Sequence, residues 1–191
     1  MGKSSSWWKG MVLAGSIAFM AAPTHAAELV VNGGFETGDF AGWTGAGETI
    51  FNGVQCPGPN PTVYAGQCGA FFGPFDSAGG IEQVIDFGSA GVAWDLSFAL
   101  ESDGSPSNFT AVLGGQVLQS LVDPLAGPYA LYKFSGISTA ATETLAFSFF
   151  DPSGFLLLDA VYASVVPEPS TVVLLSAALG AFLVRRRRRI S

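Results

Sequence analysis

The sequence predicts an all-β fold in which two antiparallel sheets form a sandwich over residues 27–166. Short β-rich runs recur at regular intervals, and Gly, Pro, Asp and Ser separate them. Apolar and polar residues alternate from Trp94 to Leu100, as in a half-buried strand, and no apolar stripe of helical period has a useful length. About 140 residues suffice for one domain with a hydrophobic core and are too few for two.

Strands are expected where apolar and β-branched residues cluster. The first, Glu28–Val31, stops at Asn32-Gly33-Gly34, and the last, Phe155–Val165, follows the turn Asp151-Pro152-Ser153-Gly154. Gly114-Gly115 predicts a two-residue hairpin turn. The strands expected between the first and the last are 81–87, 94–100, 109–113, 116–121, 129–135 and 144–150.

The charge of the predicted domain is strongly negative. Residues 27–166 carry 14 acidic side chains against the single lysine Lys133, a net of −13, because the other basic residues lie near the two ends. Such a surface repels phosphate backbones and anionic lipids, so nucleic-acid binding is excluded. The charge is typical of a secreted domain, or of one that binds divalent cations or neutral polymers.

Histidine is absent between residues 27 and 166, since the only one is His25. This excludes Ser-His-Asp and Cys-His catalysis, histidine-ligated zinc and imidazole bases from the domain. A pair of carboxylates would be the remaining catalytic route, but the acidic residues are scattered singly, mostly in turns. The protein is therefore not expected to be an enzyme.

Two cysteines, Cys56 and Cys68, flank a segment rich in Pro and Gly. Oxidising conditions after export favour a disulfide between them, which would contribute roughly 3 kcal/mol by closing the loop. The CxxC spacing of redox sites is missing, so the expected role is a structural staple; two free thiols are the alternative.

The N-terminus has the layout of a secretory signal peptide over residues 1–26. Lys3 and Lys9 precede the apolar run Met11–Ala22, and small residues at Thr24 and Ala26 suit a signal peptidase that cuts after Ala26. A helix of this length is too short to span a membrane comfortably. A retained N-terminal anchor is the alternative.

The C-terminus has three parts. Val166, Pro167, Glu168, Pro169 and Ser170 form an extended elbow, because proline disfavours helix. The uncharged run Thr171–Val184 follows, and as a transmembrane helix it would cover ~21 Å, less than a ~30 Å hydrocarbon core. The arginines that close the chain predict a cytoplasmic end. They are Arg185, Arg186, Arg187, Arg188 and Arg189.

This arrangement over residues 167–191 resembles the PEP-CTERM sorting signal of Gram-negative bacteria. The resemblance implies recognition by an exosortase, a membrane transpeptidase that cuts near the motif. The protein would thus be anchored transiently in the inner membrane and then reach the cell surface or the extracellular matrix. A plain tail anchor that is never cut is the alternative.

The stretch LVVNGGFETGDFAGWT, residues 29–44, resembles the opening of secreted carbohydrate-binding modules with a galactose-binding-like jelly roll. Leu158-Asp159-Ala160-Val161 is similar to the pattern that ends their last strand, except that Ala160 replaces a second Asp. The resemblance covers residues 29–165 in outline and implies a jelly-roll sandwich.

The same resemblance implies a structural calcium ion with Glu36 and Asp159 as ligands, although Ala160 removes a third carboxylate. The alternative is a simple turn with a solvated Glu36. Trp43 is a candidate sugar platform or a core residue. The other aromatic candidates are Tyr64, Phe71, Phe72, Phe75, Tyr129 and Tyr132.

The sequence therefore predicts a non-catalytic β-sandwich that an exosortase sorts to the cell surface or biofilm matrix, with a structural or interaction role. The alternative is a protein that binds exopolysaccharide.

Overall fold

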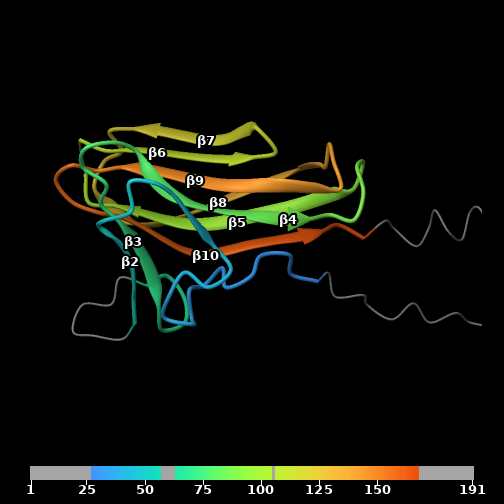
Figure 1. Ribbon diagram of the computed structural model, residues 1–191, viewed down its shortest axis with the longest axis horizontal. Coiled ribbons are helices and arrows are strands. Elements are labelled where there is room, and N and C mark those ends of the chain that lie inside the picture. The colour runs from blue at the N-terminus through green and yellow to red at the C-terminus, as the bar shows by residue number, and fades with distance from the viewer. Residues whose placement is uncertain (1–26, 57–62, 105, 168–191) are drawn as a thin grey trace, which may run out of the picture. The chain divides into compact units, whose positions relative to one another are not determined.

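The structure is a computed structural model that describes residues 27–56, 63–104 and 106–167 (Figure 1). These residues form two antiparallel sheets of five strands each, which confirms the predicted all-β sandwich. In this part of the chain no helix is long and apolar enough to cross a membrane. The expected signal peptide and transmembrane helix lie outside the described residues.

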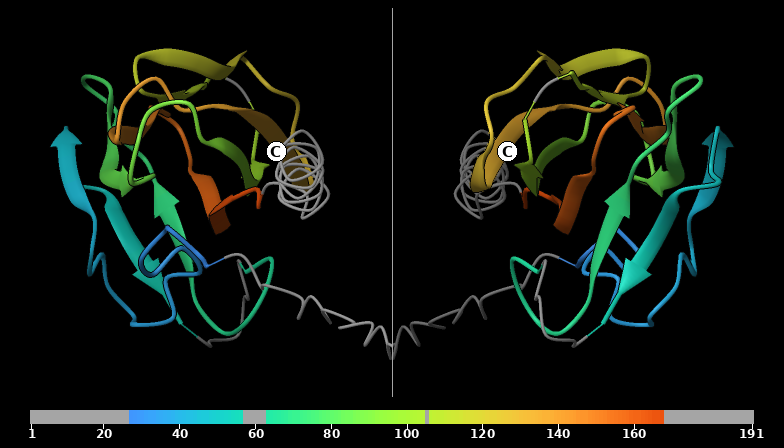
Figure 2. Two further views of the ribbon diagram at one scale, coloured as in Figure 1. Left: turned by 90° about the vertical axis from the view of Figure 1, so that its right-hand side faces the viewer. Right: turned by 90° about the vertical axis from the view of Figure 1, so that its left-hand side faces the viewer.

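The strands of each sheet are hydrogen-bonded in a non-sequential order. The first sheet, in the order of its strands, is β1 (Thr44–Gly47), β4 (Gly79–Asp86), β9 (Thr142–Phe150), β6 (Asn108–Leu113) and β7 (Gln116–Val122). The second is β2 (Asn52–Gln55), β3 (Gly69–Phe72), β10 (Leu156–Val165), β5 (Ala93–Ser102) and β8 (Gly127–Ile137). Figure 2 looks along the long axis of Figure 1 and shows these strands arranged around a common interior.

Aromatic side chains from both sheets fill this interior. The ring of Phe72 on β3 stacks on Phe149 of β9 with centroids 3.9 Å apart. Phe98 on β5 packs against Phe109 of β6 and edge-on against Phe147 of β9. All five rings are almost fully buried, so the two sheets are held together mainly by hydrophobic burial.

Seven of the eight expected strands are confirmed, and the first is wrong. Glu28–Val31 makes only an isolated bridge between Glu28 and Ser164, together with a hydrogen bond from the Leu29 amide to the Ala163 carbonyl. Gly114 and Gly115, with φ of 56° and 82°, form the predicted hairpin turn between β6 and β7.

The segment that follows Val31 is organised by polar side chains instead. The Asn32 amide donates to the carbonyls of Asp39 and Ala41, and the Trp43 indole donates to the Asn32 carbonyl. Phe35, at the centre of this loop, is fully buried. The residues that resemble the start of a carbohydrate-binding module thus build a packed loop and not a strand.

Candidate functional site

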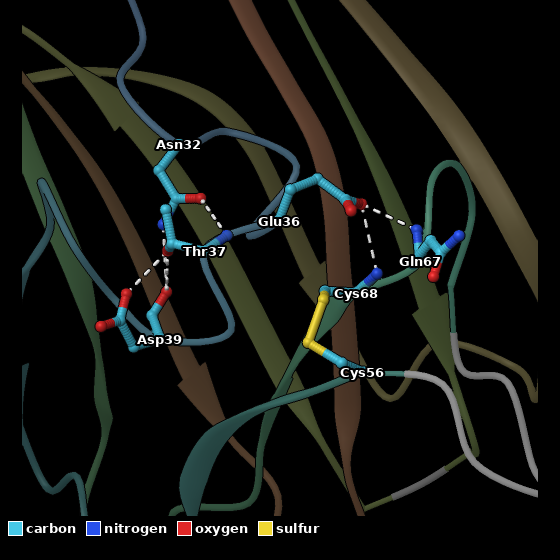
Figure 3. The surroundings of a disulfide bond; sticks show 7 residues. All are labelled: Asn32, Glu36, Thr37, Asp39, Cys56, Gln67 and Cys68. Carbon is cyan, nitrogen blue, oxygen red and sulfur yellow. Dashed lines mark hydrogen bonds between the residues drawn. A yellow bond between two sulfur atoms is a disulfide. The ribbon is translucent and has the colours of Figure 1, made fainter.

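A disulfide fixes the segment that leads into β3. Cys56 and Cys68 are bonded, as predicted, and no cysteine is free. Figure 3 shows this bond beside the loop that carries Glu36. The residues between the described position 63 and Cys68 form what we call the 63–68 loop.

Asp159 anchors one half of the 63–68 loop. Its side chain is fully buried, and Oδ2 accepts the amides of Tyr64 and Ala65 at 2.8 and 2.9 Å. Oδ1 accepts the amide of Ala160 at 2.6 Å. Burial raises the pKa of the Asp159 carboxyl, and the negative charge of Glu36 adds to this effect, while the three N–H donors oppose it.

Glu36 anchors the other half. Its Oε1 accepts the amides of Gln67 and Cys68 at 2.9 and 3.2 Å (Figure 3). The structure therefore brings Glu36 and Asp159 to the same loop from two distant segments, as the resemblance implied. Glu36 is exposed, but its carboxylate is bonded to the loop and is not free in solvent.

The described residues do not fit a calcium ion at this position. Asp159 Oδ2 and Glu36 Oε1 each already accept two N–H groups. The partial positive charge of these N–H groups lies beside the oxygens to which a cation would have to bind. Among the described residues no group of three or more His, Cys, Asp or Glu side chains could hold a metal. Calcium requires six to eight oxygens, which these two carboxylates with their N–H donors do not offer.

The outer face of the second sheet, opposite the core, carries a row of large side chains. The register places Leu157 of β10 beside Phe71 of β3 on one side and beside Glu101 of β5 on the other. Because side chains alternate along a strand and Leu156 and Leu158 point into the core, these three lie outside.

A hollow of about 270 Å³ opens on this face. It is lined by Gln55, Phe71, Phe155 and Leu157, and the rings of Phe71 and Phe155 meet edge-on at 5.4 Å. Phe155 also lines a second hollow of about 230 Å³ together with Phe51 and Phe75, whose rings are 5.5 Å apart. Phe51, Phe75 and Phe155 are between 42% and 47% exposed, so their faces are available to a ligand.

Two tyrosines extend the face across the sheet. Tyr64 of the 63–68 loop is 44% exposed and lies against Tyr129 of β8, with ring centroids 5.7 Å apart. Burial raises the pKa of the Tyr129 phenol, and the negative charges of Asp159 and Glu101 raise it further. We call the set Phe51, Phe75, Phe155, Phe71, Tyr64 and Tyr129 the aromatic track.

Trp43 is not part of this track. It is 8% exposed, packs against Phe35 and Phe147, and its indole N–H is hydrogen-bonded. The structure thus makes Trp43 a core residue, and Phe72 is likewise fully buried. Sequence reasoning missed Phe51 and Phe155, which stand beside turn residues as the buried Trp43 does, so the sequence alone carries no signal that separates them.

A pair of carboxyl groups lies below the second hollow. Asp151 is 1% exposed; its Oδ1 accepts the amides of Ser153 and Gly154, and its buried Oδ2 has no hydrogen-bond donor among the described residues. Burial raises the pKa of Asp151, and Asp103, within hydrogen-bonding reach, raises it further. A proton shared between the two carboxyl groups would satisfy Oδ2.

The raised pKa values predict a stability that falls with rising pH. A carboxyl group with a higher pKa in the folded chain than in the unfolded chain favours folding while protonated, and this contribution disappears as the pH passes the folded-state value. Asp151 and Asp159 are both of this kind. We expect a higher melting temperature at about pH 5 than at about pH 7.5.

Asp151→Asn is expected to raise the melting temperature at the higher pH by a few degrees, because the amide can donate to Asp103. It should also flatten the dependence on pH. Thermal unfolding followed by circular dichroism measures both effects, with the exposed Asp95→Asn as the control. If Asp151→Asn has the same pH profile as the unaltered protein, a proton shared between Asp103 and Asp151 does not cause the pH dependence of stability.

The fold is similar to that of carbohydrate-binding modules of known structure. The module TmCBM61, solved in complex with β-1,4-galactotriose, is 19% identical, with a TM-score of 0.60 over 74% of this chain and all of that one. The CBM22-1 xylan-binding domain of Xyn10C from Paenibacillus barcinonensis is 17% identical, with a TM-score of 0.50 over 78% of this chain and all of that one.

The fold is also similar to that of an enzymatically active domain. Tailspike protein 4 of bacteriophage CBA120 is 13% identical, with a TM-score of 0.56 over 73% of this chain and 21% of that one. At these identities the likenesses establish the jelly-roll fold. No curated protein sequence matches the chain.

Residues 165–189 match the PEP-CTERM protein-sorting motif, which confirms the family resemblance of the C-terminus. The motif indicates export and sorting to the surface of a Gram-negative bacterium, and it implies processing by an exosortase. It begins where the sandwich ends: the Val166 amide donates to the Ala93 carbonyl, and Pro167 is the last described residue. Glu168, Pro169, Ser170 and the five arginines lie outside the described residues.

Proposed function

We propose that this protein is a non-catalytic surface protein that binds a neutral polysaccharide of the cell envelope or matrix along the aromatic track. The observation that carries the proposal is the track itself. Sugar rings stack on exposed aromatic faces, and a polar group beside each ring fixes the orientation of the ligand.

The geometry of the track suits a polymer better than a single sugar. Phe155 lines both hollows, so the two adjoin each other at this ring. Gln55 lines the first hollow and Glu101 lies opposite Leu157 on the same face, so these two side chains can supply hydrogen-bonding groups beside the rings. The neighbours solved with galactotriose or named as xylan-binding support a ligand of this chemical class.

Charge selects among polymers. The domain from residue 27 to 166 carries a net of −13, so a uronic-acid or phosphate polymer would be repelled, whereas a neutral chain would not.

Binding without catalysis follows from the same residues. The segment 27–166 has no histidine, and the pair Asp103–Asp151 is a poor catalytic dyad because Asp151 is 1% exposed and its Oδ2 is fully buried. A substrate bond could not reach that carboxyl group.

Binding of the secreted protein to soluble β-1,4-galactan, to xylan and to the producing cell's own exopolysaccharide tests the proposal. Affinity electrophoresis or calorimetry should show retention on at least one of the three. Phe155→Ala and Tyr64→Ala are each expected to weaken it about tenfold, the loss of roughly 1.4 kcal/mol that an exposed aromatic anchor supplies.

Val117→Ala is the matched control, because Val117 is 57% exposed and lies on β7 of the opposite sheet. It should bind as the unaltered protein does. Retention on none of the polymers, or equal losses in all three variants, would contradict a binding role for the track.

A further inference from the structure

The 63–68 loop is held by two carboxylates in a nearly symmetrical way. Two consecutive amides, those of Tyr64 and Ala65, donate to Asp159, and the next two after Gly66 donate to Glu36. The four donor–acceptor distances lie between 2.8 and 3.2 Å. Charge-assisted bonds of this kind are about twice as strong as neutral ones.

Gly66 is the pivot between the two pairs. Its φ is +73°, and a Cβ at this position would stand 2.0 Å from Glu36 Oε1. Only glycine lets the loop turn here and leaves room for the carboxylate. The sequence of the loop is therefore matched to the carboxylate that it receives.

The two carboxylates also control where Tyr64 lies. The Tyr64 backbone amide is bonded to Asp159, a fully buried side chain of the central strand β10, and the Tyr64 ring contacts Tyr129. A displacement of the loop would therefore move one end of the aromatic track. Neither carboxylate has a direct place in that track.

We propose that Glu36 and Asp159 are positioning residues that hold the 63–68 loop, and with it Tyr64, through backbone amides and without a metal ion. In this chain four N–H groups supply the positive charge that a bound cation would otherwise supply between the two carboxylates. We call this metal-free hold of Glu36 and Asp159 on the 63–68 loop the clamp. The link between the clamp and ligand affinity rests on the proposed polysaccharide binding. The clamp itself does not depend on that proposal.

The first test uses the full secreted protein without any polysaccharide. Addition of calcium chloride or of a chelator is expected to shift its melting temperature by less than about 1 °C, because the carboxylates are already satisfied. Asp159→Asn and Glu36→Gln should accelerate hydrogen exchange at the loop amides by at least about tenfold, while far-ultraviolet circular dichroism keeps the β spectrum. Glu82→Gln, on β4 of the other sheet, is the control for exchange.

The second test uses the polysaccharide retained in the binding experiment. Asp159→Asn should lower its affinity about tenfold, and adding Tyr64→Ala should cause little further loss, because both substitutions remove the same contact.

Stabilisation by calcium of several degrees, or unchanged exchange at Tyr64 and Ala65 in Asp159→Asn, would overturn the clamp. Additive losses in the double variant would overturn its link to Tyr64. Absence of any polysaccharide binding would count against the proposed function alone, since the exchange and calcium results still decide the clamp.

Discussion

Protein released from the cell surface is expected to lack every peptide from Thr171 to Ser191. The PEP-CTERM motif at residues 165–189 implies cleavage by an exosortase near Pro167 and Pro169. Because proline disfavours helix, the sequence predicts an extended backbone here that a protease can reach. Mass spectrometry of the released fraction should find the peptides of the sandwich and none from the arginine cluster.

The double variant Pro167→Ala/Pro169→Ala should reverse the result and leave the intact chain in the membrane fraction. Pro124→Ala/Pro128→Ala is the matched control, because these two prolines lie in or beside β8, far along the chain from the motif. It should be processed normally. Recovery of the unaltered protein with Arg185–Arg189 still attached would show that the C-terminus is a permanent anchor.

The strands that could be predicted have six or more residues, and the clearest of them shows an alternation of apolar and polar side chains. The segment Trp94–Leu100 shows this alternation because one face of β5 packs in the core and the other faces outward. β1, β2 and β3 have four residues each, and β1 is exposed throughout, so they carry too little periodicity to detect. Glu28–Val31 has the composition of a strand, but the buried Gln83 amide bonds the Val31 backbone and replaces the ladder.

The site could be predicted in part for similar reasons. The disulfide could be predicted from the oxidising conditions that follow export. The resemblance to carbohydrate-binding modules predicted that Glu36 and Asp159 lie close together. The nature of their partners could not be predicted, because it depends on the direction of backbone amides in a Gly-containing loop. Trp43 and Phe155 are both large aromatics beside turns, and only the packing of the loop from Asn32 to Trp43 decides which of them is buried.

The loop from Asn32 to Trp43 also explains why the Asn32-Gly33-Gly34 motif needs its first glycine, Gly33. The Gly33 carbonyl accepts the Val161 amide at 2.9 Å, which joins the loop to the irregular part of β10 between Asp159 and Tyr162. A Cβ on Gly33 would stand 1.8 Å from the Val161 carbonyl oxygen, a backbone atom that no side-chain rotation can move. Gly33→Ala must therefore separate the loop from β10 and disturb the buried Phe35 nearby.

We expect Gly33→Ala to lower the free energy of unfolding by about 3 kcal/mol, at the upper end of ordinary single substitutions. For a domain of this size the melting temperature would fall on the order of 10 °C. Gly34→Ala is the matched control beside it, because its Cβ would meet Glu36 Cγ at 3.7 Å and Asp159 Oδ1 at 4.0 Å, which are ordinary contacts. Chemical denaturation of both variants measures the difference. Equal stabilities would show that the Gly33 contact with β10 does not constrain the loop, whereas a loss confined to Gly33→Ala would show that the first glycine of the motif is required for packing and the second is not.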